Sequence, residues 1–243
     1  MRARAVLLEI AVQDSAGARV ALASGADRLE LCQALEVGGL TPSIGVVESA
    51  FDAVDPRRVA VLVRPRPGGF VYDADEVDAV ARDIRAVVSR GAGSVVVGAL
   101  TPEGGADAEA LRRWSDAAEH AEIVFHRAID TLGDPVALID DLADLGVRRV
   151  LSSGGAARSI DGTGSLARMV ERAAGRLEIM AGGGVRVEDI PALISTGVDA
   201  VHLSARRRAG DSGGGPGGGG AVGYDVTDAA TVVAASDALG AWA

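Results

Sequence analysis

A short glycine-centred pattern recurs four times in this chain of 243 residues. The copies are Ser24–Asp27, Arg90–Gly93, Leu145–Arg148 and Thr196–Asp199, and each leads into an apolar run. Glycine placed just after a helix adopts the left-handed conformation that ends the helix, which a residue with a β-carbon resists. Each copy therefore predicts a junction between a helix and the strand that follows it.

Eight apolar runs of strand length lie along the chain, and stretches of helical periodicity separate them. The runs are Val6–Ala11, Arg28–Leu31, Val59–Val63, Ser94–Val97, Ile123–His126, Val150–Ser152, Leu177–Ala181 and Ala200–Leu203. The helical stretches include Asp73–Arg90, Asp107–Glu119 and Asp134–Leu145. Nearly continuous apolar strands are typical of a parallel sheet covered by helices. Because the glycine pattern precedes the second, fourth, sixth and eighth runs, we predict an α/β fold, a single-domain (β/α)8 TIM barrel over residues 1–243.

Composition excludes several classes of function. The net charge of −10 disfavours nucleic acid as a partner, and no apolar run is long enough to span a membrane. The N-terminal apolar run meets Glu9 too early for a signal peptide, and Cys32 is the only cysteine, so we expect a cytoplasmic protein without disulfides. The chain contains no lysine, which excludes an aldolase that works through a Schiff base.

The glycine pattern also predicts which strand face looks into the barrel. Five residues after each glycine stand Glu30, Val96, Leu151 and His202, and seven after stand Cys32, Gly98, Ser153 and Ser204. Residues two apart share one face of a strand, and a carboxylate at Glu30 would be costly beneath the outer helices. This face should therefore line the lumen. Cys32 should lie near the C-terminal rim, where active sites of such barrels lie. The floor at the other end of the barrel needs no charges.

Polar residues gather at the predicted C-terminal ends of the strands. We expect acid–base chemistry from Glu9, Glu30, His126 and Asp130, since a lumen holding such groups is costly for packing alone. Phosphate binding is a second possibility, with Gly182–Gly184 after the seventh strand and Ser204 after the eighth as the cradle. The other candidate ligand contacts are Arg64, Arg66, Arg127, Ser153 and His202. Arg64 and Arg66 could clamp an anionic group. The alternative interpretation of Gly182–Gly184 is a tight turn between a strand and a helix.

Two features lie outside this pattern. The segment Gly210–Gly223 is rich in glycine and predicts a flexible loop before a last helix near Asp225–Leu239. Trp114 stands on an otherwise polar helix and is a candidate contact between subunits.

Eight strings, spread in order from the first strand to about residue 208, resemble the CutC family. They are LLEI (Leu7–Ile10), GADRLELC (Gly25–Cys32), GGLTPSIGV (Gly38–Val46), VRPRPGGFVY (Val63–Tyr72), FHRAID (Phe125–Asp130), VLSSGG (Val150–Gly155), MAGGGV (Met180–Val185) and HLSARR (His202–Arg207). The resemblance implies a barrel associated with copper tolerance and Cu(I) binding, and a homodimer or higher homo-oligomer. It also implies Cys32 as a metal ligand, whereas Ala11 replaces the family's other cysteine.

Three functions remain open at this level. They are a copper-handling protein, an acid–base enzyme for a small anionic or phosphorylated metabolite, and a binding protein without catalysis. Cu(I) prefers soft thiolate or thioether donors, so Cys32 would need help from His126, His202 or a second subunit. A hard divalent metal held by Glu9, Glu30 and His126 is a further alternative, which the nearby Arg64 disfavours.

Overall fold

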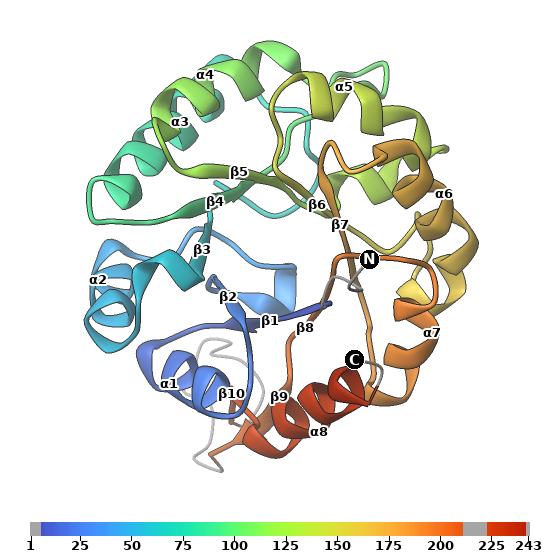
Figure 1. Cartoon of the computed structure of the whole chain (residues 1–243). Helices are drawn as coiled ribbons and strands as arrows, with labels where there is room; N and C mark the ends of the chain where they lie inside the picture. Colours follow the sequence, from blue (N-terminus) through green and yellow to red (C-terminus); the bar gives the residue numbers. More distant parts are fainter. Residues whose placement is uncertain (1–5, 211–222, 242–243) are drawn as a thin grey trace.

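Eight parallel strands close into a barrel, and helices surround it (Figure 1). The computed structural model describes residues 6–210 and 223–241. The barrel strands are β1 (Leu7–Val12), β2 (Arg28–Leu31), β3 (Val59–Leu62), β4 (Ser94–Val97), β5 (Glu122–Phe125), β6 (Arg149–Ser152), β7 (Glu178–Gly182) and β8 (Ala200–Leu203). Each strand pairs with its neighbour in sequence, and β8 pairs with β1 to close the sheet. The predicted (β/α)8 barrel is confirmed, and every predicted strand boundary lies within one residue of the observed one.

The outer layer consists mainly of α-helices. These are α1 (Ser15–Ala23), α2 (Ile44–Ala53), α3 (Ala74–Val88), α4 (Ala108–Ala118), α5 (Ile139–Asp144), α6 (Thr163–Ala173), α7 (Ile190–Ile194) and α8 (Ala229–Gly240). Side-chain oxygens cap several of them, and in α3 Asp73 and Glu76 form a reciprocal capping box. The four repeat glycines have φ values of 104°, 105°, 79° and 86°, as the pattern predicts. The stretch predicted as one helix over Asp134–Leu145 is a 3-10 turn, Pro135–Leu138, followed by α5.

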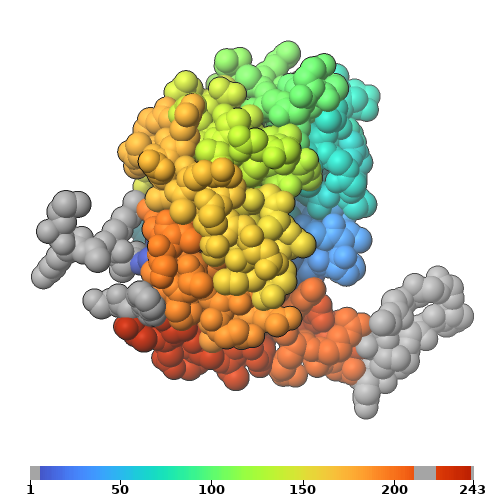
Figure 2. Space-filling view, turned by 90° about the vertical axis from the view of Figure 1, so that its right-hand side faces the viewer, coloured from blue at the N-terminus to red at the C-terminus, as the bar shows by residue number. Residues whose placement is uncertain are grey.

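A two-stranded antiparallel ribbon follows the barrel. Strands β9 (Arg206–Ala209) and β10 (Tyr224–Thr227) pair with each other, and Figure 2 shows this region projecting beyond the body of the barrel. The last helix predicted near Asp225–Leu239 is α8, but it begins four residues later than predicted, because Asp225 lies in β10 and pairs with Arg206 at 2.8 Å. Helix α8 begins only after Asp228, whose carboxylate caps it. Residues 211–222 of the predicted glycine-rich loop lie outside the described residues.

Trp114 is a core residue. Its side chain is 1% exposed, and its indole nitrogen donates a hydrogen bond to the Val77 carbonyl of α3 at 3.0 Å. The expectation that Trp114 contacts a second subunit is therefore wrong. Helix α4 buries this ring against α3, together with Ala110, Leu111, Ala117 and Ala118.

Charged side chains divide the barrel lumen. One small apolar cluster lies on the side of β2 to β5 and contains Cys32, Ala60, Leu62, Val96 and Val124. A second cluster lies on the side of β6 to β8 and contains Leu151, Met180 and Ala200. Glu9, Glu30 and His202 are also in the lumen, and all three are buried or nearly so. The lumen-facing register predicted from the glycine pattern agrees with these clusters.

Candidate functional site

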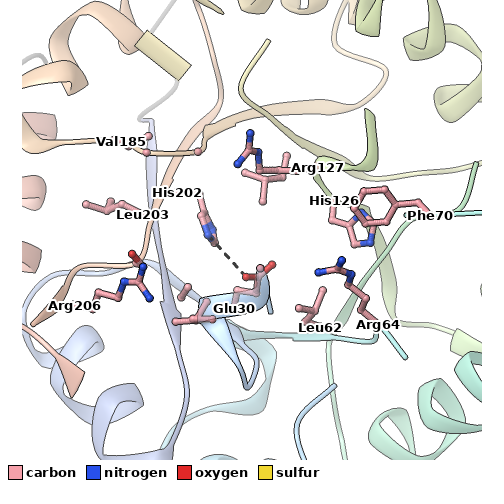
Figure 3. Close-up of a pocket in the computed structure, with 17 residues that line it drawn as sticks. Glu30, Leu62, Arg64, Phe70, His126, Arg127, Val185, His202, Leu203 and Arg206 are labelled. Carbon is pink, nitrogen blue, oxygen red and sulfur yellow. Dashed lines mark ion pairs between the residues drawn. The ribbon is translucent and has the colours of Figure 1, made fainter. Parts of the chain in front are cut away.

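A cavity of about 300 Å³ opens at the C-terminal ends of the barrel strands (Figure 3). Its lining includes Glu30, Arg64, Phe70, His126, Arg127, Gly183, Gly184, His202, Ser204 and Arg206. Figure 3 shows Arg64, Phe70 and His126 on one side and Val185, Leu203 and Arg206 on the other. Glu30 and His202 lie between them. The cavity thus brings together charged and polar residues from β2, β8 and the loops after β3, β5 and β7, as active sites of such barrels do.

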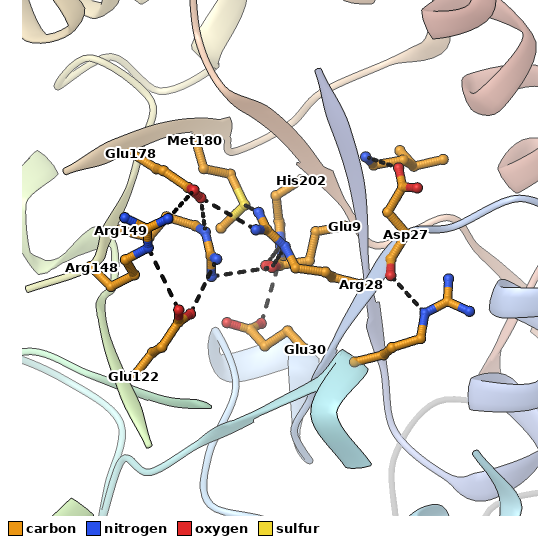
Figure 4. Close-up of polar contacts among 12 residues, drawn as sticks. Glu9, Asp27, Arg28, Glu30, Glu122, Arg148, Arg149, Glu178, Met180 and His202 are labelled. Carbon is orange, nitrogen blue, oxygen red and sulfur yellow. Dashed lines mark hydrogen bonds and ion pairs between the residues drawn. The ribbon is translucent and has the colours of Figure 1, made fainter. Parts of the chain in front are cut away.

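The floor of the barrel, at the N-terminal ends of the strands, is charged (Figure 4). Arg149 donates from Nε to Glu178 Oε2 at 2.9 Å, and Arg28 Nη1 lies 3.3 Å from the same oxygen. Burial by itself would raise the pKa of Glu178, but Arg149, Arg28 and Arg148 lower it to about 2. The expectation of a floor without charges is wrong. The charged floor could have been predicted from the sequence, because Arg28 and Arg149 stand three residues after repeat glycines, in the lumen-facing register.

Glu9, His202 and Glu30 form a chain from the floor to the cavity. Glu9 is 1% exposed, and its Oε1 lies 3.0 Å from His202 Nδ1. Its Oε2 lies 3.3 Å from Arg28 Nε and 4.0 Å from Arg149 Nη1. On the other side of the imidazole, His202 Nε2 lies 3.8 Å from Glu30 Oε2. Of the two carboxylates, only Glu30 lines the cavity.

The contacts among Glu9, His202 and Glu30, together with their burial, shift the pKa values of all three residues. Burial by itself would lower the pKa of His202, but Glu30 and Glu9 together raise it. Burial opposes ionisation of Glu9 as well, yet the hydrogen bond to His202 and the charges of His202, Arg28 and Arg149 lower its pKa. Burial raises the pKa of Glu30, and His202 offsets only part of that effect. These shifts favour the charged form of His202 and the protonated form of Glu30.

His126 lies in a different environment on the opposite wall. Its Nδ1 accepts a hydrogen bond from the Ala128 N–H at 3.2 Å, so the imidazole caps the 3-10 turn Arg127–Thr131. Burial, together with the positive charge of Arg64, lowers the pKa of His126 to about 3. We predicted His126 as an acid or base, and this role stays a prediction. The geometry restricts the form it can take, because the ring is neutral and Nδ1 is occupied.

Glycine at position 98 makes room for this ring. A β-carbon on Gly98 would lie 2.4 Å from His126 Nδ1, which is closer than real β-carbons approach other atoms. Position 182 on β7 is similar, because a β-carbon there would lie 3.2 Å from the β-carbon of His202 and 2.5 Å from Leu151 Cδ1. Gly182 therefore contributes space beside His202 and does not itself line the cavity.

Arg64 is mostly occupied by backbone carbonyls. Its Nη1 donates to the carbonyls of Val37 and Gly39, and its Nη2 donates to that of Gly68 at 3.0 Å. The guanidinium carbon lies 5.0 Å from the centre of the Phe70 ring, a cation–π contact. Sequence reasoning missed Phe70, whose place in the cavity depends on the path of the loop after β3.

Arg66 is directed away from the cavity. Its guanidinium pairs with Glu76 and donates to the carbonyls of Gly69 and Val71. The structure therefore does not bring Arg64 and Arg66 together as the clamp that we expected.

The loops after β7 and β8 form the polar wall opposite His126. Gly183 and Gly184 have φ values of 112° and 61°, in the left-handed region, and both line the cavity with Ser204. A β-carbon on Gly183 would lie 2.7 Å from Arg127 Cζ, so the Arg127 guanidinium rests directly on this turn. Backbone N–H groups in such turns, together with a guanidinium, suit an anion.

Asp130 and Ser153 support Arg127. Asp130 Oδ2 accepts from Arg127 Nε at 2.7 Å, and both Asp130 oxygens accept from the Ser153 N–H. The Ser153 hydroxyl accepts from Arg127 Nη2 at 3.0 Å. Neither Asp130 nor Ser153 lines the cavity. Both instead fix the guanidinium that does.

Cys32 does not fit a copper ligand. Its side chain is fully buried in the apolar cluster of β2 to β5, and its sulfur contacts the Val12 carbonyl oxygen at 3.9 Å. Burial first, and then the charges of Glu30 and Glu36, raises the pKa of the thiol well above its usual value. Cu(I) needs a thiolate and further soft donors. Within residues 6–210 and 223–241, no three histidine, cysteine, aspartate or glutamate side chains gather as a metal site.

None of the helices in the described parts of the chain is long and apolar enough to cross a membrane.

Comparison with known proteins gives a consistent picture. The model of the CutC family matches residues 6–207. A CutC family protein of Caulobacter vibrioides is 44% identical over 205 residues, which cover 84% of this chain and 83% of the relative. One from Xanthomonas campestris is 41% identical over 200 residues, covering 82% and 83%. The crystal structure of a Streptococcus agalactiae protein named for copper homeostasis, CutC, is similar with a TM-score of 0.75 and 34% identity, covering 81% of this chain and 97% of that one.

Proposed function

This chain belongs to the CutC family, and we propose that it is an acid–base enzyme that acts on a small anionic metabolite at the C-terminal mouth of its barrel. The observation that carries the proposal is the chain of Glu9, His202 and Glu30, which ends in the cavity. A buried carboxylate that orients an imidazole, which in turn faces a second carboxyl group, is a way to tune a proton-transfer group.

Glu30 is the group that exchanges protons with the ligand. It is the only carboxylate among the described residues that line the cavity, and burial keeps its pKa above the usual range. His202 stabilises the ionised form of Glu30 from 3.8 Å, and Glu30 and Glu9 both raise the pKa of His202. Glu30 can therefore take up a proton and return it, which is the requirement for general acid–base catalysis.

The ligand binds through an anionic end. Arg127, Gly183, Gly184 and Ser204 line the wall beside His202 and offer a fixed positive charge, backbone N–H groups and a hydroxyl. The Arg127 guanidinium is held in place by Asp130 and Ser153, so it needs little reorganisation to bind an anion. A cavity of about 300 Å³ is at the small end of ligand sites.

The test measures binding of ethyl phosphate by calorimetry, followed by a screen of phosphorylated metabolites for turnover. We expect Arg127→Gln to weaken binding of ethyl phosphate about tenfold, because one charge-assisted contact is lost. The matched control Arg82→Gln, on the outer surface of α3, should bind like the wild type. Failure of ethyl phosphate to bind the wild-type protein would overturn the proposal.

A copper role is the second candidate, and it is supported by the name of the Streptococcus agalactiae protein. The burial and the protonated state of the Cys32 thiol argue against it. An anaerobic Cu(I) competition titration of the wild type and Cys32→Ser decides between them. We expect no tight binding in either protein, whereas one-to-one binding lost in Cys32→Ser would establish the copper site. The cytoplasmic location and the homo-oligomer expected from the sequence remain predictions.

A further inference from the structure

One wall of the cavity carries two nitrogen donors that meet no acceptor among the described residues. His126 Nε2 and Arg64 Nε are both buried, and neither atom makes a well-formed hydrogen bond with a described residue, although the Arg64 side chain also interacts with the Tyr72 hydroxyl. Both side chains lie against the same ring, since Phe70 is 4.9 Å from the His126 ring centre and 5.0 Å from Arg64 Cζ. Buried polar groups are nearly always hydrogen-bonded in folded proteins. Two such donors beside the same Phe70 ring therefore point to an acceptor that binds at this wall.

The backbone fixes the tautomer of His126. Because Nδ1 accepts the Ala128 N–H, the ring proton must be on Nε2. A neutral imidazole in this state has one N–H to donate and no free lone pair with which to take a proton. His126 thus complements Glu30, since one can hold an oxygen while the other moves a proton.

The two walls and the centre of the cavity have different chemistry. Figure 3 shows Arg64 and His126 on one side, Arg206 and Val185 on the opposite side, and Glu30 between them. The opposite wall also includes the turn at Gly183–Gly184. A ligand that spans the cavity would therefore present an acceptor oxygen at one end, an anion at the other, and its central atoms to Glu30.

We propose that the substrate is a small phosphorylated carbonyl compound, with its carbonyl oxygen on His126 Nε2 and Arg64 Nε and its phosphate at Gly183–Gly184. The reaction is proton transfer at the carbon next to the carbonyl. This inference rests on the proposed function and adds to it the substrate class and the role of His126.

The proton-transfer step needs no co-reactant. The Glu30 carboxylate removes the proton from the carbon next to the carbonyl, and the electron pair of the broken C–H bond forms a carbon–carbon double bond. The carbonyl π electrons move to the oxygen, and the N–H groups of His126 and Arg64 stabilise the resulting enolate. Return of the proton from Glu30 to the carbon it left, with the electron pair of the double bond forming the new C–H bond, restores the carbonyl and completes the reaction. The chain has no lysine, so the carbonyl cannot instead be activated as an imine.

The first readout is the ¹⁵N spectrum of the imidazoles. The chain has only three histidines, and His120 is exposed, so the spectrum is simple to assign. We expect the His126 signals of the neutral Nε2–H form, and we expect Nε2 to shift when 2-phosphoglycolate binds but not when ethyl phosphate binds. A His126 that carries its proton on Nδ1, or one that does not respond to 2-phosphoglycolate, would overturn the inference.

The second readout is affinity. Wild-type protein should bind 2-phosphoglycolate, whose carboxylate mimics the enolate oxygens, at least tenfold more tightly than ethyl phosphate. His126→Phe should reduce that preference to about twofold, and His120→Phe, the same change at an exposed position, should keep it. Equal affinity of the wild type for both probes contradicts the inference alone, whereas absence of ethyl phosphate binding contradicts the proposed function. If His126→Phe does not fold, the wild-type spectrum and the wild-type preference decide.

Discussion

The pKa values of the two histidines of the barrel mouth are shifted in opposite directions. At the end of β8, Glu9 and Glu30 flank His202 and raise its pKa. At the end of β5, Arg64 adds to the effect of burial, and the pKa of His126 falls to about 3. Both rings are largely buried, so burial by itself would make both neutral. The difference teaches that neighbouring carboxylates outweigh burial at His202, whereas at His126 burial dominates and the charge of Arg64 adds to it.

The largest expected effect comes from removing the carboxylate that charges His202. Glu9→Gln leaves Arg28, Arg149 and a charged imidazole buried without their carboxylate, which should lower the free energy of unfolding by about 3 kcal/mol. Chemical denaturation measures this loss, and NMR titration should show that the pKa of His202 falls. The exposed pair of Glu48 and Arg90 supplies the control, because Glu48→Gln should cost at most about 0.5 kcal/mol. A loss below about 1 kcal/mol for Glu9→Gln would mean that the ion pairs of Glu9 contribute little to the stability of the barrel.

The next effect is a pH dependence that belongs to His126. Because its folded-state pKa is about 3 and its ordinary value is 6.5, the unfolded chain takes up the proton first as the pH falls. The stabilisation is complete above pH 6.5 and is lost as the pH falls from there toward 3. Between pH 7 and pH 5 this group should cost the wild type about 2 kcal/mol of unfolding free energy.

The variant His126→Asn keeps a side chain that can cap the turn but cannot titrate. Its unfolding free energy should fall by about 2 kcal/mol less than that of the wild type over the same pH range. His120→Asn, at an exposed position, should follow the wild-type curve. Identical pH dependence of the wild type and His126→Asn would show that folding does not lower the pKa of His126, and the contrast with His202 would be lost.

The smallest expected effect comes from two glycines, each beside one histidine. Gly98→Ala places a β-carbon against the His126 ring, and Gly182→Ala places one against Leu151 and His202. Each should cost about 1 kcal/mol, because a neighbouring side chain must shift. Imidazole NMR should show that the first change perturbs only His126 and the second only His202. Gly45→Ala in α2 meets no atom within 4 Å and should be neutral or stabilising. Changes at both rings in either variant would mean that the two sides of the mouth are coupled.

Much of this architecture was predictable because its signals are local. The glycines at 25, 91, 146 and 197 end helices by their own backbone conformation, and they fix the register of the strands that follow. From that register, Glu30, His202 and Ser204 were assigned to the lumen, and they line the cavity. The ribbon of β9 and β10 was missed, since its pairing depends on contacts such as Arg206 with Asp225 across a glycine-rich segment.

The roles of individual side chains were less predictable. The sequence paired Glu30 with His126 as acid and base, whereas His202 is the imidazole that lies beside Glu30. Arg66 stands two residues after Arg64, and we expected the two to bind one anionic group, but Arg66 instead pairs with Glu76 of α3, away from the cavity. Each of these outcomes depends on where a loop or helix from another part of the chain ends.

The sequence by itself determined the barrel, its lumen-facing register and the exclusion of Schiff-base chemistry, because periodicity, glycine caps and the lack of lysine are properties of the chain. Only the tertiary structure decided which histidine has its pKa raised and which has it lowered. Glu9 and His202 are 193 residues apart in the sequence, yet they meet at 3.0 Å because β8 pairs with β1 to close the barrel. A pKa depends on distances between groups in space, and the closure of the sheet sets those distances.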